Sequence, residues 1–114
     1  MSLTGKRAEI ATLLSTVPDV HGHDRRPVVP NTGDAWPVLG PWDRSSGDAG
    51  IQTWLVRVFM PQEEVAASDW WDQHWPSIYY ALKPAGFIDR AVPVVIGQGQ
   101  DQQLAFEITM RAEE

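Results

Sequence analysis

The chain has 114 residues, of which 43% are hydrophobic, with a net charge of −6 and no cysteine. This size and composition predict a single folded domain around one core, and they exclude disulfides and thiolate metal sites. The acidic charge argues against direct DNA binding, since phosphate contacts normally require a basic face.

Hydropathy along the chain gives no sign of a membrane segment or a leader. No apolar run approaches the roughly 20 residues that a membrane span needs. The first residues, MSLTGKRAEIATLL, lack the apolar core of a signal peptide. We therefore expect a soluble intracellular protein that is not processed and has no membrane partner.

The first predicted element is an amphipathic helix. Apolar residues from Leu3 to Val17 recur at spacings of three, four and seven, which places them on one helix face. Ser2 and Thr4 are candidate N-caps. Pro18 predicts the end of the helix at Val17, because the residue before a proline is disfavoured in the α conformation.

Two weak strands and a loop are predicted next. Residues Val20 to Arg26 suit a short edge strand, and Pro27 to Asp34 form a loop rich in turn residues. The segment Ala35 to Asp43 is apolar but contains Pro37 and Pro41, which cannot donate ladder hydrogen bonds. It is therefore expected at an edge or with a bulge.

The strongest strand is predicted at Ile51 to Met60, after a polar turn at Arg44 to Gly50. Its two faces are both mostly apolar, which predicts a central strand covered on both sides. Near the end of the chain, Gly86 to Gly97 and the alternating segment Gln103 to Arg111 predict a hairpin.

A long helix is predicted between these strands, and Pro61 suits its first helical position. Glu63 and Glu64 suit its positive end, although Ser68 is an alternative N-cap. The expected core stripe consists of Ala67, Trp71, Trp75, Ile78 and Leu82.

Trp70 does not share the direction of this stripe. It lies roughly 100° from the centre of the stripe, so Trp70 and Trp71 cannot both point into one core. Either Trp70 packs under a neighbouring loop, or it anchors a subunit interface, where tryptophan is enriched. The sequence is compatible with both.

Together these elements predict a single α+β domain over residues 1–114. We expect a mostly antiparallel sheet of 4–5 strands, with two helices packed on one face.

No residue pattern indicates catalysis or a bound cofactor. His21 and His23 share a strand face next to Asp24, but a metal site needs a further ligand of recognisable spacing. His74 has no partner four residues away, and no nucleophile elbow or phosphate loop is present. We predict that the protein is not an enzyme and has no cofactor or metal, and that its histidines are solvated or hydrogen-bonded.

The order of five segments resembles tail terminator proteins of long-tailed (siphovirus) phages that infect actinobacteria. The likeness spans nearly the whole chain and rests on the succession of segments more than on any single one. The segments are MSLTGKRAEIATLLSTV, GDAWPVLGPWDR, FMPQEEVAASDWWDQHW, LKPAGFIDRAVPV and LAFEITMR.

The resemblance implies a small α+β subunit, a structural virion protein at the neck end of the tail that is assembled in the host cytoplasm. Such a subunit forms a hexameric ring that caps the tail tube, stops its polymerisation and joins the head-side connector. DNA passes through the lumen of the ring without specific binding, which an acidic lining would favour.

Partner contacts are expected in the loops at Pro27 to Asp34 and Asp43 to Gly50, and at Trp70. Ordinary flexible loops are the alternative for both segments. The candidate interface residues are Asn31, Asp34, Asp43, Arg44, Asp48 and Trp70.

Two other functions remain open from the sequence. One is another head–tail neck component, such as a head-closure protein. The other is a small ligand-binding or lyase-like cone whose pocket is lined by Trp36, Trp42 and Trp54.

Overall fold

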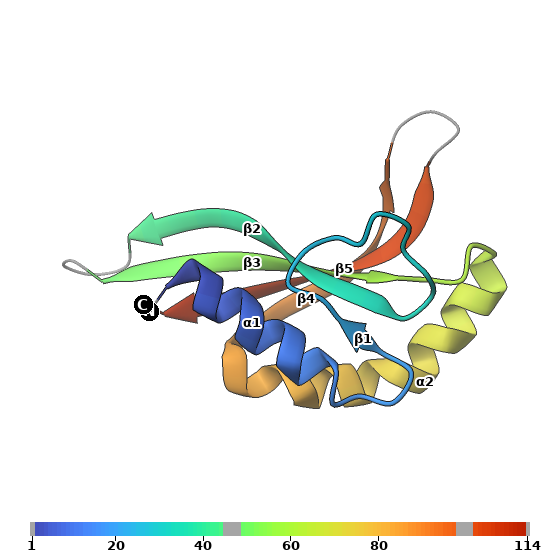
Figure 1. Ribbon diagram of the computed structural model, residues 1–114, viewed down its shortest axis with the longest axis horizontal. Helices are drawn as coiled ribbons and strands as arrows, with labels where there is room; N and C mark the ends of the chain where they lie inside the picture. Colours follow the sequence, from blue (N-terminus) through green and yellow to red (C-terminus); the bar gives the residue numbers. More distant parts are fainter. Residues whose placement is uncertain (1, 45–48, 98–101, 114) are drawn as a thin grey trace.

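The computed structural model describes residues 2–44, 49–97 and 102–113, and within them the chain forms two layers (Figure 1). The five strands form one sheet in the order β1-β2-β3-β5-β4, and only β1 and β2 run parallel. Both α-helices lie on the same face of this sheet, so the predicted α+β fold is confirmed. The elements are α1 (Leu3–Leu14), β1 (His21–Gly22), β2 (Asp34–Arg44), β3 (Gly50–Phe59), α2 (Glu64–Leu82), the short 3-10 helix η1 (Lys83–Ala85), β4 (Phe87–Ile96) and β5 (Gln103–Glu113).

Helix α1 starts where the sequence predicts and ends slightly earlier. Ser2 is the N-cap, and its Oγ accepts a hydrogen bond from the Gly5 N–H at 2.9 Å. The helix stops at Leu14, and tighter bonds carry the chain on, with the Val17 N–H donating to the Leu14 carbonyl. Val17 is still buried, so the predicted apolar face extends past the helix.

Strand β2 confirms what its prolines predict. Strand β1 pairs only with Asp34 and Ala35, so most of β2 forms the edge of the sheet. A register shift lies between Leu39 and Trp42. The buried Gln52 amide holds this bulge, because its Nε2 donates to the Gly40 carbonyl at 2.8 Å.

Strand β3 is central, but helices cover only one of its faces. Trp54, Val56 and Val58 are almost completely buried on the helix side, whereas Leu55 and Arg57 on the other side are half-buried. The expectation that both sides are covered therefore holds only in part. A second, smaller cluster covers one end of the far face, formed by Trp36, Phe59, Ile96 and Ala105.

Helix α2 begins at Glu64, with Glu63 as its N-cap. Neither Pro61 nor Ser68 marks the start, so those predictions were wrong. Both oxygens of the Glu63 carboxylate accept backbone N–H bonds, and the Ser68 hydroxyl bonds back to the Glu64 carbonyl.

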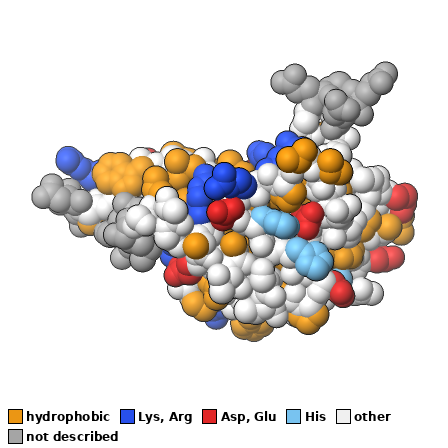
Figure 2. All heavy atoms as spheres, in the orientation of Figure 1, with side chains coloured by type: hydrophobic (Ala, Val, Ile, Leu, Met, Phe, Trp, Pro, Cys, Tyr) orange, Lys and Arg blue, Asp and Glu red, His pale blue; other side chains and the backbone are white. Residues whose placement is uncertain are grey.

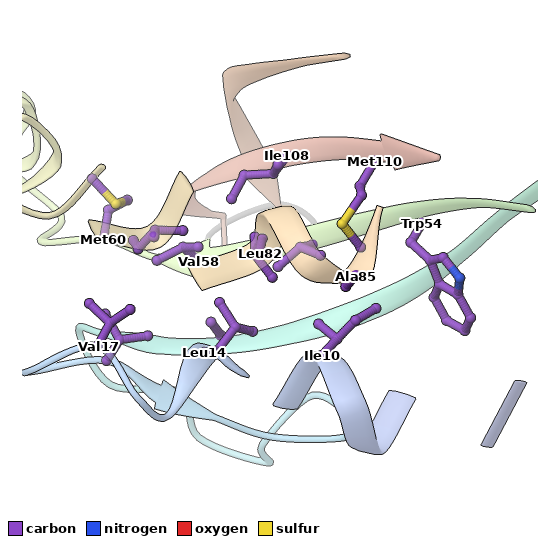
Figure 3. Packing of buried hydrophobic residues seen from close by; sticks show 14 of the residues in the cluster. Ile10, Leu14, Val17, Trp54, Val58, Met60, Leu82, Ala85, Ile108 and Met110 are labelled. Atoms are coloured by element: carbon purple, nitrogen blue, oxygen red, sulfur yellow. The ribbon is translucent and has the colours of Figure 1, made fainter. Parts of the chain in front are cut away.

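The core stripe of α2 is confirmed for its smaller members. Ala67, Ile78 and Leu82 are buried, whereas Trp71 and Trp75 are partly exposed and pack against the edge of the core. Figure 3 shows α1 residues facing Leu82 and the strand residues across the main core. Within the described part of the chain, no helix is long and apolar enough to cross a membrane.

Candidate functional site

Trp70 packs inside the subunit, beside the loop that leads into β2. Its ring stacks on the His74 ring, with centroids 4.0 Å apart. A Cβ placed on Gly33 would lie 3.8 Å from Trp70 Cζ2, so the indole lies against that glycine. The loop-packing reading accounts for this geometry, and a role of the remaining exposed indole surface in an interface stays a prediction.

Asp34 is an internal anchor of the same loop. Its Oδ1 lies 3.0 Å from His23 Nε2, and its Oδ2 accepts the Asn31 N–H at 2.8 Å. The residue is 7% exposed, so its carboxylate offers little surface to another chain. The sequence placed Asp34 among the partner-contacting residues, and the structure instead gives it a role in holding the loop.

The other interface candidates do not converge on one surface. Asn31 is exposed in the loop before β2, while Asp43 and Arg44 are exposed at the far end of that strand. At about 3.3 Å per residue, these two positions are roughly 30 Å apart. Asp48 lies outside the described residues.

Two histidines are engaged within the subunit. His23 pairs with Asp34, and His74 Nδ1 lies 2.7 Å from the Trp70 carbonyl oxygen. His74 Nε2 is also 3.8 Å from an Asp19 carboxylate oxygen. In the described ranges, no cluster of three or more His, Cys, Asp or Glu side chains suits a metal ion.

The three tryptophans proposed to line one pocket are dispersed. Trp54 belongs to the main core under the helices, whereas Trp36 belongs to the cluster on the opposite face of the sheet. Trp42 is 50% exposed and lies over Gly50, near the far end of β2. They cannot form the wall of a single cavity.

Two hollows on the described surface, each of about 350 Å³, lie elsewhere. The first lies beside α1 and includes Arg7 and Arg25, and Figure 2 shows Lys and Arg side chains gathered over this part of the face. The second, named here the α2–β4 groove, is lined by Gln62, Glu64, Ala67, Ser68, Pro93, Leu104 and Phe106.

The loop between β1 and β2 carries the most exposed apolar residues described in the chain. Val28 and Val29 are 99% and 74% exposed, between Arg25-Arg26 and the buried Pro30. We call Arg25 to Pro30 the valine loop. The sequence predicted partner contacts here but named Asn31 and Asp34, and the signal that it missed was an apolar pair flanked by prolines.

No protein-family model matches this chain, and no curated protein sequence matches it.

Proposed function

We propose that this chain is a tail terminator, a structural virion subunit that forms a hexameric ring. The ring caps the tail tube, stops its polymerisation and joins the head-side connector. The proposal takes its identity from the resemblance of the five segments, and the fold that the resemblance implies agrees with the observed one.

The proposed ring assembly is supported by large apolar side chains that are exposed at opposite edges of the sheet. Val28 belongs to the loop beside the β1 edge, whereas Phe87 and Val95 belong to the β4 edge and are 63% and 61% exposed. Apolar side chains that are grouped on an exposed surface are candidates for contact with a partner, whereas singly exposed ones are ordinary. Two different surfaces on opposite edges suit head-to-tail contacts, which close into a ring.

The uncovered face of the sheet supplies a further surface for tube or connector proteins. It combines apolar side chains with ion pairs between neighbouring strands. Arg57 lies 3.1 Å from Glu107, and Arg111 lies 2.8 Å from Asp89. Such a mixture of apolar and satisfied charged groups is typical of non-obligate interfaces. The subunit is proposed to act in the virion neck without catalysis or a cofactor, with DNA passing the lumen.

A tube-capping assay tests the proposal. Purified tail tube subunits are polymerised with and without this protein, and tube lengths are measured by negative-stain electron microscopy. We expect shorter tubes with a ring at one end. Unchanged lengths and bare ends would contradict a terminator, and binding to the connector alone would favour a head-closure protein.

A further inference from the structure

We propose that the valine loop of one copy inserts into the α2–β4 groove of a second copy of this chain. The inference rests on the proposed assembly into a ring and specifies the contact that links neighbouring subunits. Four observations support this contact: the shape of the loop, the lining of the groove, the charges of the two surfaces and the positions of the two surfaces on the sheet.

The loop presents its two valines as a fixed protrusion. Pro27 is half-buried and Pro30 is buried, while Val28 and Val29 between them point into solvent. Proline fixes φ of its own residue and restricts the residue before it. The Asp34 carboxylate also holds the end of the loop through the Asn31 N–H. The valines are therefore held in place before binding, which lowers the entropy cost of docking.

The groove is mostly apolar, and one of its aromatic side chains is held by stacking. Ala67, Pro93, Leu104 and Phe106 supply its apolar lining. The Phe106 ring stacks on Trp71, with centroids 3.8 Å apart. Gln62 is fixed beside Leu104 in the lining, because its side chain donates to the Leu104 carbonyl and accepts the Leu104 N–H. A preformed apolar hollow with few polar groups suits a small apolar side chain.

The charges around the two surfaces are opposite. The valine loop carries Arg25 and Arg26, and both are exposed. All four charged residues at the start of α2, from Glu63 to Asp72, are acidic, and Glu64 lines the groove itself. Complementary charges of this kind orient two copies and fix the register of docking.

The positions of the two surfaces select a second copy as the occupant. The valine loop follows β1 at one edge of the sheet, whereas Pro93 of the groove belongs to β4 at the other edge. Backbone pairing between edges is disfavoured, since Pro37 and Pro41 interrupt β2 and Pro93 interrupts β4. Neighbouring copies can therefore associate through side-chain docking between opposite edges, and the same contact can repeat from head to tail.

Thiol cross-linking tests the contact directly, because the chain has no native cysteine. Val28→Cys and Ser68→Cys are made as separate exposed-site variants and joined with a short bis-maleimide. We expect cross-linked dimers when the two variants are mixed and little product from either alone. A chain that carries both substitutions should give a ladder of covalent multimers.

These measurements distinguish an error in the proposed docking contact from an error in the proposed ring. If native mass spectrometry shows the oligomer but the mixture yields no more product than the single variants, the docking inference is wrong and the ring stands. If no oligomer forms under any condition, alone or with tube subunits, both are wrong.

Exchanging the charges of the two surfaces provides an independent test of the docking contact. Arg26→Glu and Glu64→Arg should each raise the Kd of self-association about tenfold, and the double variant should recover most of that loss. Additive losses in the double variant would overturn the pairing of these two surfaces. Melting temperatures close to that of the unaltered protein are the control for folding.

Discussion

At the scale of single residues, Asp34 decides how the loop before β2 is held. Removing its carboxylate leaves the Asn31 N–H and the His23 ring without their shared acceptor. We expect Asp34→Ala to lower the free energy of unfolding by about 1–3 kcal/mol, measured by urea denaturation. The exposed Asp24→Ala is the matched control and should change it by less than about 0.5 kcal/mol. Equal effects would show that the internal role assigned to Asp34 is wrong.

Glu63 gives α2 a stability that depends on pH. The backbone N–H groups of Ala66 and Val65 donate to its carboxylate and hold the pKa of Glu63 below its ordinary value of 4.5. A lowered folded-state pKa stabilises the fold above the unfolded pKa and loses that effect as pH falls through the folded one. Glu63→Ala should therefore lower the melting temperature at pH 7, and the difference should shrink below pH 4.5.

Glu64→Ala is the matched control for the loss of the Glu63 cap. Glu64 is the next residue in the first turn, and among the described residues its side chain caps no backbone N–H. Its effect on the melting temperature at pH 7 should be smaller than that of Glu63→Ala. A Glu63→Ala deficit that persists unchanged at the lower pH would contradict the cap as its cause.

At the scale of elements, α2 is held to the core by a narrow set of side chains. Ile78 is completely buried, whereas its neighbour Ser77 is exposed. We expect Ile78→Ala to lower the free energy of unfolding by about 2–5 kcal/mol, as buried large-to-small changes do. Ser77→Ala should be nearly neutral, and both are measured by equilibrium unfolding. A neutral Ile78→Ala would overturn the helix phase.

The elements themselves were predictable where local chemistry decides them. The bulge of β2 follows from its prolines, and the β4–β5 hairpin follows from alternation and a glycine-containing turn. The half-exposure of Trp71 and Trp75 was not predictable, because it depends on how α2 lies over the sheet. The second cluster around Trp36 likewise depends on tertiary pairing between β2, β3 and the hairpin.

The candidate site was harder to predict from the sequence than the fold was. The groove combines residues from Gln62 to Phe106, which only the sheet order brings together. The valine loop was predicted as a contact segment, yet apolar Val28 and Val29 would ordinarily be expected inside. The exposure of these two valines could be recognised only from the three-dimensional structure, in which the flanking Pro27 is half-buried and Pro30 is buried.

At the scale of the whole molecule, the described chain is a flattened body of 46 × 31 × 23 Å whose two sheet edges carry different surfaces. Because its two edges differ, such a subunit can associate through contacts between unlike surfaces, without a twofold axis between neighbours. Repeated edge-to-edge association of such subunits gives a closed ring when the rotation between neighbours divides a full turn. A closed ring of this kind is one defined oligomer, whereas a rotation that does not close gives an open filament.

Native mass measurement of the purified protein, alone and with tail tube subunits, tests this claim most directly. Six chains of 12.7 kDa should give a species of about 76 kDa, either free or bound to tube ends. A stable 12.7 kDa monomer that neither forms rings nor associates with tubes would contradict the proposed function.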